Sequence, residues 1–595
     1  MILDGAPALR RELERRWLAF VVIAWVVASA WFVFDRWSAI RWLSLGDTDD
    51  NMRLMQVRAW MAGQGWYDLR QYRMNPPAGF DIHWSRIVDL PIAGLILLFR
   101  QFTSPSWAER LAVGVAPLLP LGIVMVSLAA VTRRLVAPVA WPLALIFLIA
   151  SAGATMLMFM PERIDHHGWQ LACLAVTVAG LSDPRRGRGG ALVGLASAMS
   201  LSIGLELLPY CAMAGAIQTL RWVWDRSEER RLEIYAITLA GGGAAGFALF
   251  ASEANRVMRC DALTPVWLSV LVAAGALLYL IALIAPRTIV VRAGLAVAAG
   301  ATIAICFAMF FPQCLGRPEQ VSPELVRTWL SNVREAKPLY MHPFRVAFVI
   351  ATLPVIGLIG AIIGTWRARR TPELTGWAAV TLFTAFAVAM LAWQARAGPA
   401  AQLLAIPGAV ALAALVLPKI LGHRLMAVRV IGTAAGFVLI SGLFAGYVVR
   451  WLPAKAQANA YTKRINAATG ECMRTSRLLM LNAYPAATVF SFTDLGPRLI
   501  TVTHHNAIAG PYHRNGDAIL DVQHAFAGSP AHARAIMKRH GATLLLVCPN
   551  MSEATIYRAR NPGGFYDRMA HGEKFGWLTQ LPLRKGAPYR LYRIG

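Results

Sequence analysis

Three groups of polar residues in this chain have the types and spacing for chemistry, and each lies near a long apolar run. They are "GDTDDNMR" (46–53), "ERIDHHGW" (162–169) and "NVREAKP" (332–338). Their acidic and imidazole side chains include those of Asp47, Asp49, Asp50, Asp165, His166, His167 and Glu335. Carboxylates and imidazoles that converge repel or desolvate one another unless a cation lies between them. Hard oxygen ligands with one or two nitrogens suit Mg²⁺ or Mn²⁺, so the three groups together predict a divalent metal site.

Each group taken alone also has a simpler explanation. An acidic cluster just outside an apolar run is commonly a solvated loop. Asp165 can cap the helix that follows it by accepting backbone N–H groups, and Glu335 alone indicates little. The metal interpretation therefore depends on elements that bring the three groups to one place.

The composition indicates that those elements are membrane-spanning helices. Of 595 residues, 57% are hydrophobic and only 15% are charged. The formal net charge of +26 would suggest nucleic-acid binding in a soluble protein. Here the Lys and Arg residues occur in short clusters between apolar runs, which is the positive-inside pattern of membrane proteins, and we expect no nucleic-acid partner.

Thirteen apolar runs are candidates for membrane spans. They cover residues 17–34, 110–131, 136–156, 168–182, 190–204, 207–223, 233–251, 265–285, 288–311, 344–365, 375–394, 399–418 and 430–449. No small-residue cleavage site follows the first run, so we expect a retained helix rather than a signal peptide.

The basic clusters predict which loops share a side of the membrane. They are Arg10 to Arg16 and the segments 132–135, 184–188, 226–231, 286–292, 366–370 and 419–424. With 13 spans they all fall on the side of the N-terminus, which is then the cytoplasmic side. The outer side receives a first outer loop at 35–109, a fifth outer loop at 312–343, and the segments 157–167, 252–264, 395–398 and everything after about 450. All three polar groups therefore meet on the outer side.

The last part of the chain lacks long apolar runs. It shows short β-type segments at 487–492, 498–503 and 543–548 around a helical stretch at 529–540. We therefore expect a polytopic α-helical membrane domain, 1–450, followed by an extracytoplasmic α/β domain, 451–595. The expected location is the inner (plasma) membrane of a bacterium, with the site and the C-terminal domain facing the periplasm.

The order and spacing of the motifs resemble the catalytic subunit of oligosaccharyltransferases, which are membrane glycosyltransferases of the GT-C fold with a C-terminal domain outside the cytoplasm. The first outer loop of that family carries an Asp followed at +4 by Asn and at +6 by Arg, and Asp47, Asn51 and Arg53 keep this spacing. Its second outer loop carries Asp-x-(Asp/Glu) before a helix, which Asp165 and His167 match.

Three further matches lie later in the chain. The fifth outer loop of the family ends in Ser-Val-x-Glu or Thr-Ile-x-Glu, which "NVREAKP" resembles with Glu335 at the glutamate. The WWDYG motif of its C-terminal domain corresponds to "FTDLG" (492–496), which keeps Asp494. Arg396, at the outer end of "LAWQAR" (391–396), resembles the arginine that holds the phosphate of the lipid-linked donor.

The resemblance implies roles for these residues. The implied metal ligands are Asp47, Asp165, His167 and Glu335, of which Asp47 and Glu335 are also the implied catalytic residues. Arg396 is the implied donor-phosphate ligand, and the implied acceptor-binding or supporting residues are Asn51, Arg53, His166 and Asp494.

Two departures from the family pattern matter. Phe492 and Thr493 replace the paired tryptophans that receive the Ser or Thr of an Asn-x-Ser/Thr acceptor. His167 replaces an acid, which trades oxygen for nitrogen and shifts the expected metal from Mg²⁺ toward Mn²⁺ or another transition metal.

The expected function is metal-dependent transfer of a sugar or oligosaccharide from a polyprenyl-(pyro)phosphate donor to a glycan, lipid or protein acceptor, at the outer face of the membrane and among its lipids. One alternative is transfer of a single sugar from a polyprenyl-phosphate monosaccharide to a lipid or cell-surface polysaccharide. A transporter or lipid flippase is the non-enzyme alternative. It would place ionisable residues inside spans, and the nearest candidate is Glu206 beside Pro209.

The seven cysteines test the topology. Three lie within apolar runs, where a thiol behaves as a small hydrophobe: Cys173, Cys211 and Cys306. The other four fall on the outer side, which is oxidising in a bacterial cell. We predict the disulfides Cys260–Cys314 and Cys472–Cys548, each within one structural unit, against the alternative of four free thiols.

Overall fold

The computed structural model describes residues 7–451 and 460–595, and a helix lies on each of the thirteen predicted apolar runs. A long apolar run can satisfy its backbone groups in a membrane only by forming a helix, so local composition is enough to specify these elements. The helices are α2 (Trp17–Asp35), α6 (Pro105–Val115), α7 (Leu118–Leu135), α8 (Trp141–Ser151), α9 (Gly153–Leu157), α10 (His167–Leu181), α11 (Arg186–Ile203), α12 (Leu208–Trp224), α13 (Glu229–Phe250), α14 (Pro265–Ile284), α15 (Ile289–Phe310), α17 (Phe344–Arg367), α18 (Leu374–Met390), α19 (Gly398–Leu421), α20 (Thr433–Ile440) and α21 (Phe444–Trp451).

The number of helices that can cross a membrane is smaller than thirteen by length and composition. Among the described residues, seven helices are long and apolar enough, or eight if the helical segment 428–440 and α21, which meet at 87°, form one broken span. Apolar but shorter helices include α8, α10 and α18. The fold is therefore that of a polytopic α-helical membrane protein, and the count of 13 spans stays a prediction.

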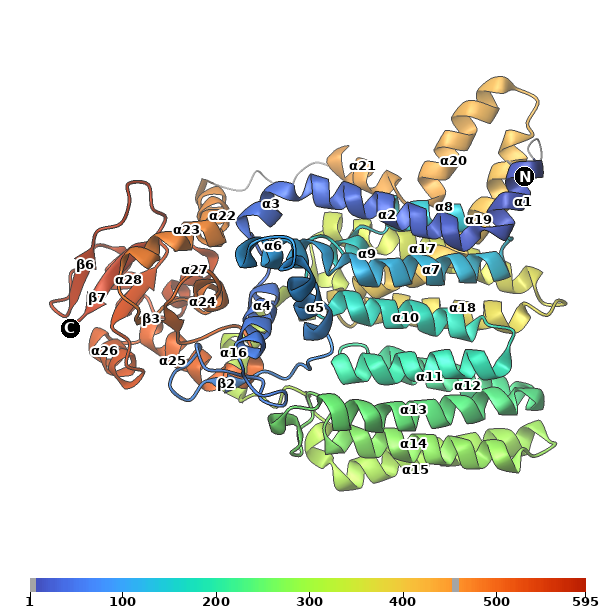
Figure 1. Cartoon of the computed structure of the whole chain (residues 1–595), viewed down its shortest axis with the longest axis horizontal. Coiled ribbons are helices and arrows are strands. Elements are labelled where there is room, and N and C mark those ends of the chain that lie inside the picture. Colours follow the sequence, from blue (N-terminus) through green and yellow to red (C-terminus); the bar gives the residue numbers. More distant parts are fainter. Residues whose placement is uncertain (1–6, 452–459) are drawn as a thin grey trace.

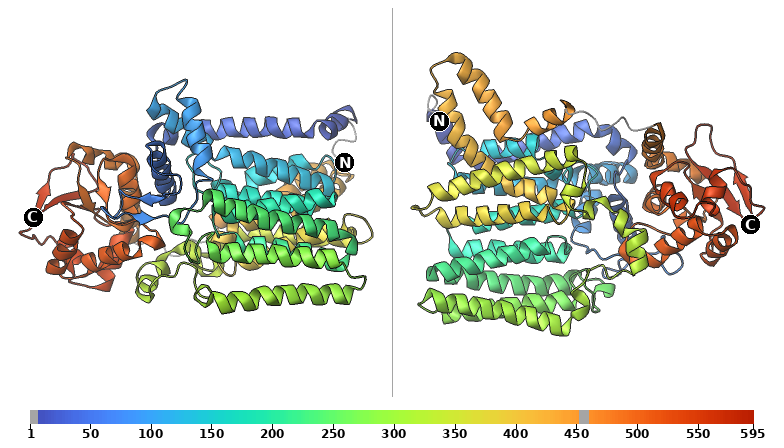
Figure 2. Two further views of the ribbon diagram at one scale, coloured as in Figure 1. Left: turned by 60° about the horizontal axis from the view of Figure 1, so that its bottom comes forward. Right: turned by 180° about the vertical axis from the view of Figure 1, so that it is seen from behind.

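Most of these helices form one bundle. In Figures 1 and 2, α10 to α15 lie side by side, and the C-terminal part of the chain lies beyond one end of them. Close approach of α17 and α19 depends on glycine, because a Cβ atom on Gly357 would lie 2.2 Å from the carbonyl oxygen of Ala405. A Cβ on Gly408 would lie 1.9 Å from the carbonyl oxygen of Gly357. Small residues thus let two backbones touch, as in other membrane helix pairs.

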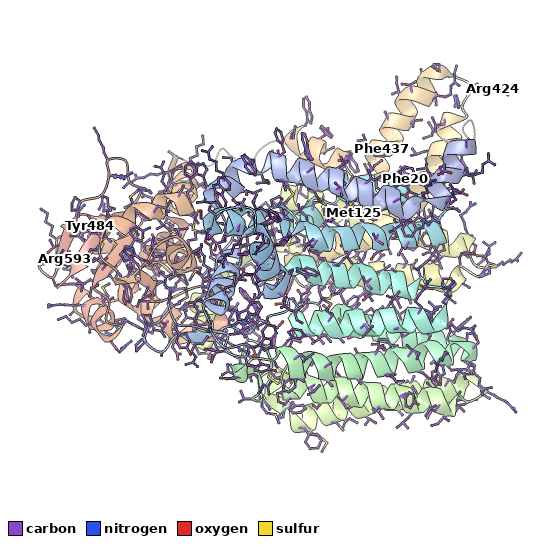
Figure 3. The ribbon with its side chains drawn as sticks, viewed as in Figure 1. Phe20, Met125, Arg424, Phe437, Tyr484 and Arg593 are labelled. Carbon is purple, nitrogen blue, oxygen red and sulfur yellow. A yellow bond between two sulfur atoms is a disulfide. The ribbon has the colours of Figure 1, made fainter. Side chains whose placement is uncertain are left out.

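The two ends of the bundle carry different parts of the chain. Arg424, in the last basic cluster, lies at the end away from the C-terminal part, which carries Tyr484 and Arg593 (Figure 3). The basic N-terminal helix α1 (Pro7–Arg15) lies at the same end as Arg424 (Figure 1). This arrangement agrees with the predicted sharing of one side by the basic segments, whereas the orientation in a membrane stays a prediction.

The residues after 460 form an α/β unit around a five-stranded sheet in the order β4-β3-β5-β7-β6. Its strands are β3 (Thr488–Phe490), β4 (Asn506–Ala507), β5 (Leu544–Val547), β6 (Leu578–Leu581) and β7 (Arg590–Ile594). β3 pairs in parallel with β4 and β5, and β7 pairs antiparallel with β5 and β6. Around the sheet lie α22 (Ala460–Cys472), α23 (Thr475–Leu478), α24 (Gly496–Val502), α25 (Gly516–Ala527), α26 (Pro530–Arg539), α27 (Ser552–Arg560) and α28 (Phe565–Ala570). The structure confirms the predicted α/β fold of this part, with β3, β5 and α26 at the predicted positions.

The prediction of a strand at 498–503 is wrong, because these residues lie in and directly after α24. The segment is rich in β-branched residues, whose local preference is for strands. In the fold it is buried almost throughout, and the hydroxyls of Thr501 and Thr503 donate to the carbonyl oxygens of Pro497 and Leu499, four residues back. Tertiary burial therefore overrides the local preference.

The first outer segment is mostly regular structure rather than loop. It contains α3 (Trp37–Trp42), α4 (Thr48–Met61), α5 (Asp89–Phe99) and a small hairpin of β1 (Arg70–Gln71) and β2 (Phe80–Asp81), and the later outer segment contains α16 (Pro323–Thr328). Met52, Met74 and Trp84 share one hydrophobic core with the C-terminal unit. The domain boundary predicted near 450 adjoins residues 452–459, which lie outside the described part, and it stays a prediction.

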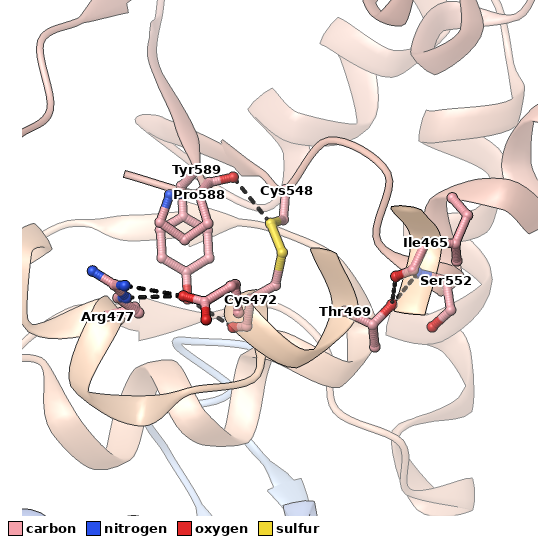
Figure 4. Close-up of a disulfide and its surroundings, with 9 residues drawn as sticks. Ile465, Thr469, Cys472, Arg477, Cys548, Ser552, Pro588 and Tyr589 are labelled. Atoms are coloured by element: carbon pink, nitrogen blue, oxygen red, sulfur yellow. Dashed lines mark hydrogen bonds and ion pairs between the residues drawn. A yellow bond between two sulfur atoms is a disulfide. The ribbon is translucent and has the colours of Figure 1, made fainter. Parts of the chain in front are cut away.

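Both predicted disulfides are present in the structure. Cys260 pairs with Cys314 at a Cα–Cα distance of 5.4 Å, and Cys472 pairs with Cys548 at 6.3 Å. Figure 4 shows the second pair, where the hydroxyl of Tyr589 donates to the carbonyl oxygen of Cys472 (2.7 Å). The second disulfide therefore ties the end of α22 to the residue after β5.

Candidate active site

The first acidic group lies at the N-terminus of α4. Asp47 is the N-cap residue, and its Oδ1 accepts hydrogen bonds from the hydroxyl of Thr48 (3.1 Å) and the backbone N–H of Asp49 (3.4 Å). A helix N-terminus favours carboxylates because its first N–H groups have no partner within the helix. The Oδ1 atom of Asp47 is thus held by its own helix, which leaves Oδ2 to face other elements.

The second group lies in the turn before α10. The Oδ1 atom of Asp165 accepts a hydrogen bond from the backbone N–H of His167, the first residue of α10 (3.1 Å). The N-cap position itself is His166, so Asp165 bonds the start of the helix from one residue further back. The backbone N–H of Asp165 donates to Oδ1 of Asp50 (3.1 Å). This bond joins segments 115 residues apart and brings the two acidic groups together.

The side chain of Arg163 lies at the meeting point of these carboxylates. Its Nη1 atom is 2.6 Å from Oδ2 of Asp47 and 3.1 Å from Oδ2 of Asp50. Its Nη2 atom is 2.8 Å from Oδ2 of Asp165. The sequence analysis missed Arg163, although a basic residue among acids on the predicted outer side is a signal that could have found it.

The cluster is electrostatically crowded. Burial, together with the negative charges of Asp47 and Asp165, raises the pKa of Asp49 to about 7. Burial also opposes ionisation of Asp165, but the imidazole of His167 and the guanidinium of Arg163 hold the pKa of Asp165 well below its ordinary value. Opposite charges thus keep Asp165 ionised, whereas Asp49 can hold a proton near neutral pH.

The predicted metal site of Asp47, Asp165, His167 and Glu335 is not formed. Among residues 7–451 and 460–595, no three or more His, Cys, Asp or Glu side chains are arranged to hold a metal ion. Ligands of Mg²⁺ or Mn²⁺ must turn their oxygens toward one shared point, and here the Nη atoms of Arg163 occupy the space that Asp47 and Asp165 face. In this arrangement the donor set does not fit a divalent cation.

Glu335 and Arg396 form a separate pair. Arg396 lies in the turn 395–397 at the N-terminus of α19, and its Nη2 atom is 3.9 Å from Oε1 of Glu335. The Glu335 side chain is 65% exposed. The Nε atom of Arg396 is buried and has no hydrogen-bond partner, so this guanidinium keeps an unused donor. Glu335 therefore lies beside the predicted phosphate ligand, with no contact to the Arg163 cluster among the described ion pairs.

Asn51 and Arg53 support the site from within the protein. Asn51 is fully buried and donates from Nδ2 to the carbonyl oxygen of Asp47 (2.6 Å). Arg53 donates to Oδ1 of Asp89 (2.8 Å), and its guanidinium lies 4.5 Å from the ring centre of Trp84. Both side chains hold α4 and its surroundings in place, and the supporting role implied by the resemblance stays a prediction.

The C-terminal unit contributes Asp494 and Arg498. Arg498 donates to the carbonyl oxygens of Gly46 (2.7 Å) and Asp494 (3.3 Å), so it ties the C-terminal unit to the residue before Asp47. Burial raises the pKa of Asp494, and the charge of Arg498 opposes that rise. The carboxylate of Glu553 holds the turn by accepting from the backbone N–H groups of Thr493 (2.7 Å) and Asp494 (3.0 Å).

His166 is held by a residue that the sequence analysis did not place in the site. Its Nε2 atom is 3.0 Å from Oε1 of Glu206, which lies in the break between α11 and α12. The other carboxylate oxygen of Glu206 accepts from Nε2 of Gln170 (2.8 Å). The interrupted apolar pattern beside Pro209 was the available signal. Glu206 belongs with the histidine pair rather than inside a span.

No known protein-family profile and no curated protein matches the sequence. Solved structures do match. The oligosaccharyltransferase AglB of Archaeoglobus fulgidus, in complex with an inhibitory peptide and a dolichol-phosphate, is similar with a TM-score of 0.66 and 14% identity. The match covers 98% of this chain and 75% of that one.

Two other structures of the Archaeoglobus fulgidus oligosaccharyltransferase are similar. The form tethered to an acceptor peptide with the NVT sequon has a TM-score of 0.65 and 14% identity, with 98% of this chain and 75% of that chain covered. The complex with Zn and sulfate has a TM-score of 0.63 and 15% identity, with 94% and 72% covered. At such identities the likeness establishes the fold, and it confirms the GT-C-like architecture with a C-terminal α/β domain.

Proposed function

We propose that this protein is a membrane glycosyltransferase that transfers a sugar or oligosaccharide from a polyprenyl-(pyro)phosphate donor to an acceptor at the outer face of the membrane. The fold supports this proposal because the similar archaeal enzyme transfers oligosaccharide and was solved with a dolichol-phosphate. From the basic clusters and the cysteines on the opposite side we infer a multi-pass protein of a bacterial inner membrane, with the site and the C-terminal unit on the periplasmic side.

The observation that carries the proposal is the convergence of Asp47 and Asp165 on one guanidinium. Asp47 is the N-cap residue of α4 and Asp165 lies in the turn before α10, and Arg163, which is 116 residues from Asp47 in the sequence, contacts both. Arg498 connects the C-terminal unit to the same site through its hydrogen bond to the carbonyl oxygen of Gly46. A transferase needs such a polar site at the end of the bundle, where a lipid-linked donor and a polar acceptor can meet.

The chain offers groups for both halves of the reaction. As the anomeric C–O bond of the donor breaks, negative charge grows on the leaving phosphate, and a fixed cation stabilises it without a proton donor. We assign this to Arg396, whose buried Nε has no partner, with Glu335 beside it. We assign Asp47, whose side chain is 43% exposed, to contact with the acceptor nucleophile.

The sequence led us to expect a divalent metal, and a similar archaeal structure holds Zn. An ion bound by carboxylates would neutralise the leaving group. Because Arg163 occupies the space between Asp47 and Asp165, we derive no step through a metal.

The acceptor is proposed to be a glycan or lipid rather than an Asn-x-Ser/Thr peptide. Phe492 is fully buried among the rings of Phe526, Tyr557 and Tyr566, and Thr493 is buried beside it. Side chains enclosed in this core cannot form a surface pocket for the hydroxyl of a sequon. This observation also favours the alternative in which a single sugar is transferred to a lipid or polysaccharide. An Asn-x-Thr peptide is expected to be a poor acceptor, and efficient glycosylation of it would refute this assignment.

The function is tested by comparing glycolipids and glycans, by mass spectrometry, from cells that contain wild-type protein, Asp47→Ala or Asp81→Asn. Asp81 is the matched control, because it pairs with Arg70 in the hairpin of the same outer segment. One glycoconjugate should disappear, and its polyprenyl-linked precursor accumulate, only with Asp47→Ala. Identical glycan profiles for all three proteins would overturn the proposal.

A further inference from the structure

In three carboxylates around Arg163, one oxygen bonds a backbone N–H group and the other faces the guanidinium. In Asp47, Asp50 and Asp165, the Oδ1 atom accepts a hydrogen bond from a backbone N–H group, of Asp49, Asp165 and His167 respectively. The Oδ2 atom of each faces Arg163, at 2.6, 3.1 and 2.8 Å.

This arrangement matches a guanidinium rather than a spherical ion. The two Nη atoms point their N–H groups in different directions, so one guanidinium can meet three carboxylates whose backbone bonds set their orientation. A divalent ion needs oxygen atoms at about 2.0–2.6 Å from one point. The Arg163 side chain is 19% exposed and that of Asp165 is fully buried, so an ion would have to displace the arginine from a partly closed position.

We propose that Arg163 is a built-in cation that replaces a divalent metal in this site, so that the carboxylate cluster assembles and works without one. The role of Arg163 in assembling the cluster does not depend on the proposed function, whereas its role in sugar transfer does. Arg163 acts here as a positioning residue: it neutralises part of the repulsion among three carboxylates and fixes the orientation of Asp47.

Metal binding by the purified, full-length protein tests this directly. The protein is treated with a chelator and then titrated with MnCl₂, with bound Mn²⁺ followed by electron paramagnetic resonance and unfolding followed by its thermal midpoint. The wild type should bind no stoichiometric Mn²⁺, and its midpoint should not depend on the ion. Arg163→Ala should unfold at a lower temperature and gain saturable Mn²⁺ binding that restores the midpoint.

Two controls separate the expected rescue of Arg163→Ala by Mn²⁺ from a general effect of losing an arginine. Arg134 pairs with Asp183, and Arg134→Ala should not be rescued by Mn²⁺. The double variant Arg163→Ala with Asp165→Asn should lose the Mn²⁺ binding that the single variant gains. One Mn²⁺ bound per wild-type chain and lost in Asp165→Asn would overturn the proposal, and this comparison does not require Arg163→Ala to fold. A folded Arg163→Ala that binds no Mn²⁺ would also overturn it.

The rate of sugar transfer provides an independent test. The wild type should keep its full rate in excess chelator, whereas Arg163→Ala should need Mn²⁺. If no variant transfers any sugar, the proposed function fails, and the Mn²⁺ binding data still decide the role of Arg163.

Discussion

Nε2 of His166 lies 3.0 Å from Oε1 of Glu206, and the His166 ring stacks on that of His167 at a centroid distance of 4.4 Å. Glu206 thus orients the histidine pair next to Asp165. We predict that Glu206→Gln lowers kcat by about 10- to 100-fold and changes the pH profile of the rate, because His166 loses its charged partner and a hydrogen bond to a charged group is worth about 1.5–3 kcal/mol. Transfer assays over a range of pH measure this, with the exposed Glu253→Gln as control. An unchanged rate and profile would mean that Glu206 only fills space.

A second prediction concerns the buried ion pairs that Asp89 forms with Arg53 and Arg86. Asp89 bonds Arg53 (2.8 Å) and Arg86 (3.1 Å), and all three side chains have 0% exposure. Asp89→Ala would leave two buried guanidinium groups without a carboxylate, and we expect a loss of about 3–5 kcal/mol in the free energy of unfolding.

The control for Asp89 is the more exposed pair Arg70–Asp81, where Arg70 is 40% exposed. Asp81→Ala should cost at most about 1 kcal/mol. Thermal unfolding of both variants in detergent measures the difference, and equal losses would contradict the importance assigned to burial.

A third prediction concerns pH. Burial raises the pKa of Asp261, but hydrogen bonds from Arg514 and His513 outweigh burial and hold that pKa well below its ordinary value of 3.8. Because the folded-state pKa is lower than the unfolded one, the stability that Asp261 contributes is present above 3.8 and is lost as the pH falls further. This contact joins the outer loop before α14 to the C-terminal unit.

Thermal midpoints of the wild type, Asp261→Asn and the exposed control Asp517→Asn test this prediction. The deficit of Asp261→Asn should be present at about pH 5 and shrink below about pH 4, because the unfolded wild-type chain then binds a proton at Asp261 that the folded protein binds only at lower pH. A deficit that is independent of pH throughout would rule out the ionised Asp261 as its source.

The fourth prediction concerns the cysteines. Alkylation of the denatured, non-reduced protein should modify three residues, Cys173, Cys211 and Cys306, and mass spectrometry should find Cys260–Cys314 and Cys472–Cys548 as linked peptides. Replacing both Cys472 and Cys548 by Ala should cost about 2–5 kcal/mol. Seven alkylated cysteines would argue against the disulfides and against the predicted sidedness.

Local sequence determined the helices. Apolar runs such as 265–285 and 344–365 became α14 and α17 because a membrane helix satisfies its own backbone, and no distant partner is needed. The bond of Asp165 to the first backbone N–H of α10 and the pairing of outer cysteines were also predictable, since the first depends on neighbouring residues and the second on sidedness. The segment 498–503 shows the limit, because its choice between strand and helix depended on burial by other elements.

Only the tertiary structure decided the composition of the site. The sequence suggested a metal between Asp47 and Asp165, yet Arg163 lies there, and its contacts with Asp47 and Asp50 span 116 and 113 residues. Glu335 pairs with Arg396 instead of joining the cluster, and Glu206 enters it through His166. Residue types show which charges need partners, but the choice among partners depends on distances between segments that meet only when the bundle and the C-terminal unit are assembled.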